Sequence, residues 1–319
     1  SVVPHKHSRC AVRCAVKPDG QKGVSLATAA AAVAPLVAAA PAWSAEHVAS
    51  VAELDATTTV LGGVALTALA STLISTDPEK RRQQMTNEAG GDEMESVKNY
   101  FNTKGFDRWN KIYGETDDVN KVQLDIREGH AQTVEKVLSW VKAEGNIEGT
   151  TVCDAGCGTG SLSIPLAQLG FKVSGSDISS SMAGEADRRA KEQLPADCKG
   201  SASFETSDLE SLSGKYHTVA CLDVMIHYPQ DKANGMVKHL ASLASDRVII
   251  SFAPYTLYYS VLKRIGELFP GPSKATRAYL HPEEEIEKAL NEAGWKVVKR
   301  EMTATSFYFS RLLEAVPAN

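Results

Sequence analysis

The chain has 319 residues and a formal net charge of −5, with 43% hydrophobic and 23% charged residues. This length allows one large domain and an extension, and the acidic balance argues against a nucleic-acid-binding protein, which would present a basic face. The six cysteines form no repeated C-x-x-C pair, which argues against a zinc site or a disulfide framework.

The first 45 residues differ in composition from the rest of the chain. Their Lys and Arg residues are opposed by a single acid, Asp19, and Ala, Val and Ser dominate. Such a basic, acid-poor start is typical of an organelle transit peptide. We therefore predict a transit peptide over residues 1–45. The small residues at 41–45 also resemble a cleavage site for export to a lumen, which stays open as the lesser alternative.

Residues 46–95 contain an apolar stretch followed by a polar one. No residue between Asp55 and Asp77 is charged, and residues 60–74 are almost wholly apolar. A membrane-spanning helix needs about 20 apolar residues, so the stretch predicts a segment that leans on a membrane more than one that crosses it. The polar run after Asp77 contains Gly90 and Gly91 and is typical of a linker.

Helical spacing begins after this linker. Aromatic and aliphatic residues recur three or four positions apart between 97 and 113, with an interruption at Gly105, and the pattern returns over 122–141. We predict a helical arm over residues 96–149 that covers a ligand cleft.

The stretch 151–160, T-V-C-D-A-G-C-G-T-G, predicts a buried strand, a glycine loop and the start of a helix. The glycines that let a ligand approach the backbone are Gly156, Gly158 and Gly160. The last glycine of the dinucleotide fingerprint is absent, so an NAD-binding protein ranks last among the alternatives. Asp154, two residues before the first glycine, suits a cationic or amino-bearing ligand better than a pyrophosphate.

Three further predicted strands are also followed by an aspartate. Asp177 is placed to accept hydrogen bonds from a ribose diol, with Ile178 beside it. Asp208 and Leu209 could bracket an adenine ring, and Asp223 follows the next strand. A single aspartate after a strand is usually a helix cap or a turn former. Four of them at one edge of one sheet instead indicate a ligand site.

The region from 150 to 319 alternates strands and helices before ending in a hairpin. Strands are predicted near 151–154, 172–177, 201–206, 217–222 and 247–252, and helices at 161–169, 180–193, 231–244 and 282–293. The final segments 295–300 and 306–316 are joined by a short polar link. This pattern predicts an α/β fold: a Rossmann-like seven-stranded sheet with helices on both faces and an antiparallel last strand.

An insertion over residues 254–280 is longer than a strand-to-helix connection needs. Its aromatic residues include Tyr255 and Tyr259, and its cations include Arg264 and Arg277. Flat rings beside cations suit a large planar ligand that bears carboxylates. A helical lid with a solvated basic face is the alternative.

The strand-end motifs together resemble the class I S-adenosylmethionine-dependent methyltransferases. The narrower resemblance, over roughly residues 97–316, is to the magnesium-protoporphyrin IX O-methyltransferases of chlorophyll synthesis, and it rests on L-D-V-M-I-H-Y-P, S-F-A-P-Y-T-L-Y-Y, L-K-R-I-G-E-L-F-P-G-P-S-K-A-T-R-A-Y-L-H and G-F-D-R-W-N-K-I-Y-G. The resemblance implies methyl transfer from S-adenosylmethionine to a propionate of Mg-protoporphyrin IX, with S-adenosylhomocysteine as the second product.

The resemblance also implies roles for individual residues. The cofactor would be bound by residues at the strand ends: Asp154, Gly156, Gly158, Gly160, Asp177, Ile178, Asp208, Leu209 and Asp223. Tyr113, in K-I-Y-G, would lie near the reacting sulfonium. His227 would orient the substrate carboxylate or meet the porphyrin magnesium. No resident metal is expected.

The resemblance further implies a setting for the protein. It indicates a chloroplast protein on the stromal side of the thylakoid or inner envelope membrane, in peripheral contact with that membrane and without nucleic acid as a partner. Magnesium chelatase subunits are the expected porphyrin donors.

Two other functions remain as alternatives at this stage. One is a class I methyltransferase acting on another hydrophobic acid or a quinone. The other is a porphyrin carrier that binds without turnover. Redox control of Cys157 or Cys198 is a further open alternative, whereas Cys153 and Cys221, inside predicted strands, are expected to be buried small hydrophobic residues.

Overall fold

The computed structural model describes residues 93–145, 147–266 and 278–318. The expected transit peptide at 1–45 lies outside these residues, as does nearly all of the segment at 46–95. The described part begins with helix α5, Glu93–Asn102, three residues before the arm was expected to start. None of the helices within the described ranges is both long and apolar enough to cross a bilayer.

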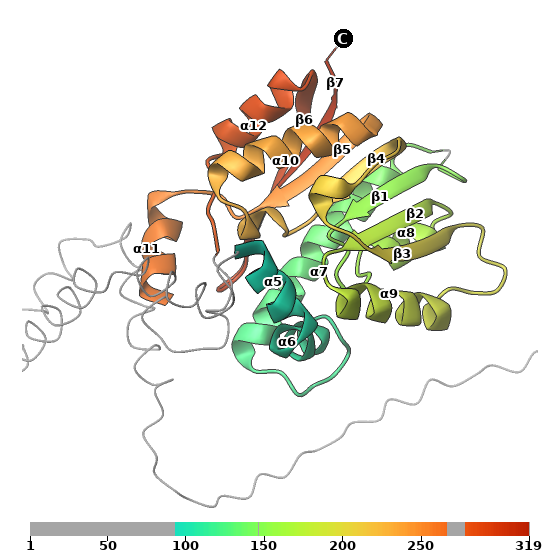
Figure 1. Cartoon of the computed structure of the whole chain (residues 1–319), viewed down its shortest axis with the longest axis horizontal. Helices are drawn as coiled ribbons and strands as arrows, with labels where there is room; N and C mark the ends of the chain where they lie inside the picture. The colour runs from blue at the N-terminus through green and yellow to red at the C-terminus, as the bar shows by residue number, and fades with distance from the viewer. Residues whose placement is uncertain (1–92, 146, 267–277, 319) are drawn as a thin grey trace, which may run out of the picture. The chain divides into compact units, whose positions relative to one another are not determined.

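A seven-stranded sheet with the order β3-β2-β1-β4-β5-β7-β6 forms the centre of the fold (Figure 1). Its strands are β1 Thr151–Ala155, β2 Lys172–Asp177, β3 Ser201–Thr206, β4 Tyr216–Cys221, β5 Ala244–Phe252, β6 Trp295–Ala304 and β7 Phe309–Pro317. The first five strands pair in parallel, and β7 is antiparallel to both β5 and β6. The predicted fold class is therefore confirmed, including its antiparallel last strand.

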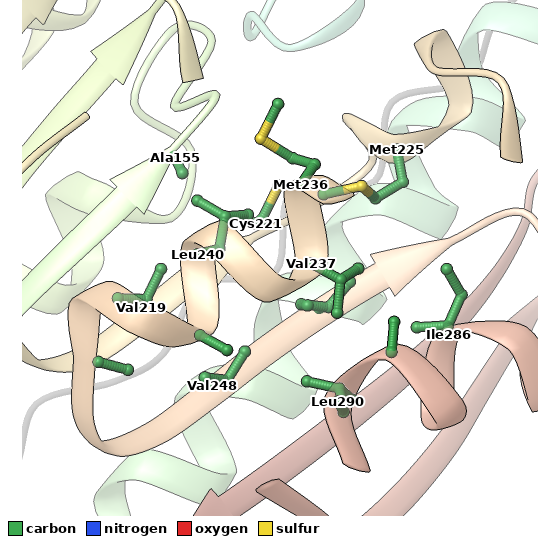
Figure 2. Close-up of a cluster of buried hydrophobic side chains, with 14 of the residues drawn as sticks. Ala155, Val219, Cys221, Met225, Met236, Val237, Leu240, Val248, Ile286 and Leu290 are labelled. Atoms are coloured by element: carbon green, nitrogen blue, oxygen red, sulfur yellow. The ribbon is translucent and has the colours of Figure 1, made fainter. Parts of the chain in front are cut away.

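Two apolar cores cover the two faces of the sheet, because successive strand residues point to opposite sides. In β4, Val219 and Cys221 join one core and Ala220 joins the other. The first core is closed by α10, Gln230–Leu243, and α12, Glu283–Glu292. Figure 2 shows Leu240 of α10 and Leu290 of α12 in this cluster.

The second core is closed by α7, Lys121–Lys142, and α8, Ser163–Gln168. Helix α7 begins with a capping box, in which the Asn120 side chain accepts from the Gln123 backbone N–H and the Gln123 side chain accepts from the Asn120 N–H. Its buried face includes Val134, Val137 and Val141. Helix α9, Ser180–Gln193, packs on β2 and β3.

Of the arm expected at 96–149, α7 packs on the sheet, and the part before it consists of α5 and α6, Lys104–Ile112. These two helices meet at Thr103, two residues before the interruption that was predicted at Gly105, and Gly105 itself lies inside α6. Asn102 fastens this part of the arm to α9, because its side-chain oxygen lies 2.9 Å from Ser179 Oγ and 3.2 Å from Ser180 Oγ. Arg127 of α7 donates to the carbonyls of Lys111 and Ile112. The arm is thus fixed to two helices of the main domain.

Several element boundaries differ from the predicted ones by a few residues, and two of these differences are informative. The last strand was expected from residue 306, but residues 305–308 form a turn before β7. The carboxylate of Asp125 accepts the backbone N–H groups of Ser306 and Phe307 and so holds this turn outside the ladder. The predicted helix 161–169 begins only at Ser163, because Gly160 keeps a left-handed φ of 85°.

The described part of the insertion contains α11, Leu257–Gly266, and the short return at 278–282. The return is hydrogen-bonded to the domain on two sides: Tyr279 N–H donates to the Ile226 carbonyl at 2.7 Å, and His281 N–H donates to the Ala253 carbonyl at 2.9 Å. The insertion therefore ends beside the loop after β4.

Replacement of Leu290 by Ala tests the first core. Leu290 is 1% exposed, and removing its side chain should lower the free energy of unfolding by about 2–5 kcal/mol through lost burial and the cavity left behind. Urea unfolding followed by circular dichroism measures this. Lys288→Ala, on the exposed side of the same helix, is the control and should change the unfolding free energy by less than about 0.5 kcal/mol. Equal losses in both variants would contradict the assigned core.

Candidate functional site

The glycine loop between β1 and α8 is tied to the end of β2. The backbone N–H groups of Gly156 and Cys157 both donate to the Ser176 carbonyl, at 2.8 and 2.9 Å. Gly158 N–H donates to Asp177 Oδ2 at 3.0 Å. These bonds place the loop and the end of β2 side by side, as the sequence predicted.

The three loop glycines have different physical requirements. All have positive φ, namely 83° at Gly156, 53° at Gly158 and 85° at Gly160. A Cβ on Gly156 would lie 2.2 Å from Val224 Cγ2, so the loop touches the segment after β4. A Cβ on Gly158 would meet nothing within 4 Å. The backbone at Gly158 is therefore open to a ligand, whereas Gly156 is required by packing.

A cavity of about 450 Å³ lies at the carboxyl ends of the strands, which is within the range of small-molecule sites. The predicted residues in its wall are Tyr113, Asp154, Gly156, Gly158, Asp177, Ile178, Leu209, Asp223, His227 and Tyr259. The structure thus brings most of the predicted site residues together.

Asp154 and Asp177 supply one buried and one half-buried acid to this wall. Asp154 is 2% exposed, and burial raises its pKa to about 6, although Ser163 Oγ donates to its carboxylate at 2.6 Å. Asp177 Oδ1 accepts from Ser179 N–H at 2.9 Å, and burial also raises the pKa of Asp177 above its usual value. Two partly compensated acids in an enclosed cavity favour a ligand that carries positive charge and hydroxyl donors.

Three predicted residues lie elsewhere in the described structure. Asp208 is absent from the cavity wall, because its carboxylate accepts from Glu210 N–H at 3.0 Å and caps the short helix η2, Leu209–Ser211. Gly160 faces Ile164 and Ala186. Tyr255 is 53% exposed and does not line the cavity. The sequence could not separate a capping aspartate from a binding one.

The two predicted arginines cannot be assigned to the wall. Arg264 belongs to α11, but its side chain is outside the described atoms, and Arg277 lies outside the described residues. Within the described part of the chain, Lys263 is the one lysine or arginine that lines the cavity. Helical periodicity alone does not distinguish neighbours such as Lys263 and Arg264.

Tyr113 and His227 approach the cavity from different elements. Tyr113 is the C-cap of α6, and its ring centroid lies 5.3 Å from that of Trp109. Burial, followed by the charge of Asp223, raises the pKa of the Tyr113 hydroxyl, which therefore stays protonated. His227 lies in η3, Met225–His227, with its ring edge-on to Phe101 at 5.3 Å. Both side chains thus combine an aromatic contact with access to the cavity.

Several wall residues were not predicted as site residues. His130 and Ser161 line the cavity together with Tyr308, which stands in the turn before β7. His130 falls within the helical pattern predicted over 122–141, which gave it no role in the site. Tyr308 carries no local motif, so nothing near it in the sequence indicates its place.

The region also contains cysteine thiols, which the structure shows to be unpaired. Cys153, Cys157 and Cys221 are buried and Cys198 is partly buried, and all four are free thiols. Burial raises the pKa of Cys157 and Cys221 well above the usual thiol value, which makes thiolate formation less favourable. No group of three His, Cys, Asp or Glu side chains suited to a metal occurs among the described residues.

Comparison with known proteins gives two family matches. A model described as the magnesium-protoporphyrin IX methyltransferase C-terminus matches residues 221–317, and a methyltransferase-domain model matches residues 152–246. Magnesium protoporphyrin IX methyltransferase, chloroplastic, of Arabidopsis thaliana is 60% identical over 274 residues, which are 86% of this chain and 87% of that protein. Magnesium-protoporphyrin O-methyltransferase of Synechocystis is 57% identical over 73% of this chain and 99% of its own length.

Two solved structures are also similar. Crystal structures of the Synechocystis magnesium protoporphyrin IX methyltransferase with bound SAH and with bound SAM align at TM-scores of 0.64 and 0.62. The first is 56% identical and covers 69% of this chain and 98% of that chain. The second is 50% identical and covers 71% and 97%.

Asp154→Asn tests the electrostatics of the cavity wall. A carboxyl whose pKa is about 6 when folded and about 4 when unfolded binds more protons in the folded state between these values, so it destabilises the protein above pH 6. The Asn variant should therefore be more stable than the parent at pH 8, by on the order of 1–3 kcal/mol, and should lose this advantage by pH 4.

Urea unfolding of the cofactor-free protein at both pH values measures the effect. Asp197→Asn, an exposed carboxylate, serves as the control and should show no such pH-dependent gain. Lower stability of Asp154→Asn at pH 8 would contradict the assigned burial cost.

Proposed function

Because the chain belongs to the magnesium-protoporphyrin IX O-methyltransferase family, we propose which of its residues carry out that family's reaction. The protein is an S-adenosylmethionine-dependent O-methyltransferase that methylates Mg-protoporphyrin IX. The observation that carries the residue assignment is one cavity in which a glycine loop, the acids Asp154 and Asp177, Tyr113 and His227 meet.

The residues at β1 and β2 fit S-adenosylmethionine. The open backbone at Gly158 leaves room for the cofactor's close approach. Asp154 would pair with its amino group, and Asp177 and Ile178 would contact its ribose. Leu209 would pack on the adenine. When bound, the cofactor supplies an electrophilic methyl group on a sulfonium.

The substrate carboxylate needs orientation and little help from a base. A propionate has a pKa near 4, so it is already ionised at neutral pH. Holding its oxygen in line with the methyl group and excluding water can contribute about 7–11 kcal/mol. The protonated hydroxyl of Tyr113 and the imidazole of His227 would donate hydrogen bonds that fix this oxygen. No proton is transferred in this step. The carboxylate becomes a neutral ester as the sulfonium becomes a neutral thioether.

The porphyrin would extend toward the insertion. Tyr259 of α11 lies in the cavity wall with its ring centroid 4.3 Å from that of Phe309 and the two planes inclined by 39°, which gives an aromatic, apolar surface. Lys263 is on the same helix and lines the same cavity. A lysine beside an apolar wall suits a second carboxylate of the same planar molecule. We assign Lys263 to the propionate that is not methylated, and Arg264 and Arg277 stay as further candidates.

The setting proposed for the protein is the chloroplast, as the name of the Arabidopsis relative indicates, on the stromal side of the thylakoid or inner envelope membrane. The exposed Leu257, Tyr258 and Val261 of α11 support peripheral membrane contact. Magnesium chelatase subunits would supply the porphyrin, since insertion of magnesium must precede this reaction.

His227→Ala tests the catalytic assignment. Loss of one hydrogen bond to a charged oxygen should lower kcat by about ten- to a hundredfold, whereas the dissociation constant for S-adenosylhomocysteine should change by less than about threefold. Steady-state kinetics and titration calorimetry measure the two quantities. His227→Gln keeps an N–H donor and should recover part of kcat. Equal losses of kcat and cofactor affinity in both variants would make His227 a structural residue.

Lys263→Gln tests the assignment of the second propionate. The porphyrin KM should rise by about tenfold through loss of one charge-assisted contact, with the cofactor KM unchanged. Lys296→Gln, an exposed lysine of β6, is the matched control for loss of one positive charge. A porphyrin KM that stays at the parental value in Lys263→Gln would remove this residue from the site.

A further inference from the structure

The carboxylate of Asp223 is occupied by side chains of the protein itself. Its Oδ1 lies 2.8 Å from Ser251 Oγ and 3.0 Å from Ser310 Oγ. Its Oδ2 lies 2.6 Å from Tyr308 Oη and 2.8 Å from His130 Nδ1. Four donors surround one carboxylate. Asp223 was predicted to bind cofactor, but this geometry instead assigns its side chain to a buried network.

The network joins segments that are distant in the sequence. It links α7 through His130, β5 through Ser251, and the final hairpin through Tyr308 and Ser310. Burial opposes the charge of Asp223, but the hydrogen bonds from His130, Tyr308 and Ser251 outweigh it and hold the pKa of Asp223 below its usual value. The backbone of Asp223 is also strained, with φ at 59°. A non-glycine residue keeps such a backbone conformation only when the surrounding structure holds it there.

Helix α7 and the hairpin meet closely at this network. A Cβ on Gly129 would lie 2.4 Å from the ring of Tyr308, so the ring rests directly on the helix backbone. The Tyr308 hydroxyl is also 3.0 Å from Thr133 Oγ1, one turn along α7. These contacts fix the position of α7 relative to the final hairpin, and with it the position of His130, the residue after Gly129.

His130 uses both nitrogens and one face of its ring. Nδ1 meets Asp223, and Nε2 lies 2.8 Å from Ser161 Oγ in the glycine loop. The ring centroid is 4.5 Å from that of Tyr113, with the planes inclined by 37°. A carboxylate that fixes Nδ1 also fixes the orientation of the whole imidazole. The same imidazole therefore contacts the cofactor loop at its edge and the proposed catalytic tyrosine at its face.

We propose that His130, oriented by Asp223, is a positioning residue that fixes the ring of Tyr113 relative to the glycine loop. In this role His130 acts through Tyr113 and contacts neither the transferred methyl group nor the propionate of the substrate. Its effect is on orientation, to which transfer rates are sensitive, because small misplacements of a reacting group can cost orders of magnitude in rate. The inference rests on the role proposed above for Tyr113.

His130→Asn is the informative variant. The Asn amide can donate to Asp223 from nearly the position of Nδ1, so the buried carboxylate keeps its partner, while the ring against Tyr113 and the contact with Ser161 are lost. Ser310→Ala is the matched control. It removes another donor to the same carboxylate at a buried position that does not line the cavity.

A double-mutant cycle with Tyr113→Phe separates positioning from stability. His130→Asn alone should lower kcat by about tenfold, but in the Tyr113→Phe background it should lower kcat by less than about twofold. Ser310→Ala should lower the Tm of the cofactor-free protein and leave kcat within about twofold of the parent. The affinity for S-adenosylhomocysteine, measured by calorimetry, should change by less than about threefold in His130→Asn.

Four results would overturn the proposal. The first is full additivity of the His130 and Tyr113 losses in the cycle. The second is an equal loss of kcat in Ser310→Ala, which would reduce the network to a structural role. The third is a lowered kcat in His130→Asn together with a parental kcat in Tyr113→Phe, which would also overturn the catalytic assignment of Tyr113. Normal kcat in His130→Asn alone would overturn the positioning role and leave that of Tyr113 standing.

Discussion

The site depends on the hydrogen-bonded junction between the glycine loop and the end of β2. Two loop N–H groups donate to the Ser176 carbonyl and a third donates to Asp177. The junction sets the separation of Asp154 and Asp177, since Asp154 precedes the loop and Asp177 accepts from it. It also fixes Gly156 against Val224 and so locates the loop after β4, which carries His227. One local arrangement thereby orients the proposed cofactor and substrate sides together.

The helical arm and the insertion complete the cavity from outside the sheet. The arm contributes Tyr113 and is fastened through Arg127 and through Asn102. The insertion contributes Tyr259 and Lys263, and Tyr279 in its return donates a backbone hydrogen bond to the carbonyl of Ile226, next to His227. The residues proposed for the cofactor therefore follow the parallel strands, whereas Tyr259 and Lys263, which are proposed for the porphyrin, come from an element added to them. This division explains how a common methyltransferase sheet acts on a large planar substrate.

Local sequence patterns predicted the sheet and one side of the site. Strand and helix alternation determines a parallel sheet, and the spacing of Asp154 and the glycines places them at its carboxyl edge. Asp208 was not separated from the other three strand-end aspartates because an aspartate after a strand serves equally as a cap, which is its place at η2. His130 and Tyr308 were missed because their shared partner, Asp223, is 93 and 85 residues away in the chain. Contacts of that kind depend on the completed fold and leave no local pattern.

The most direct test of the account is a single-turnover assay with S-adenosylmethionine labelled on its methyl group. The purified protein is offered Mg-protoporphyrin IX, metal-free protoporphyrin IX and a quinol in parallel, and the label in each product is counted. The account predicts label in the ester of Mg-protoporphyrin IX and little in the other two. Label in the quinol alone, or in none of the three although the cofactor is bound, would contradict it.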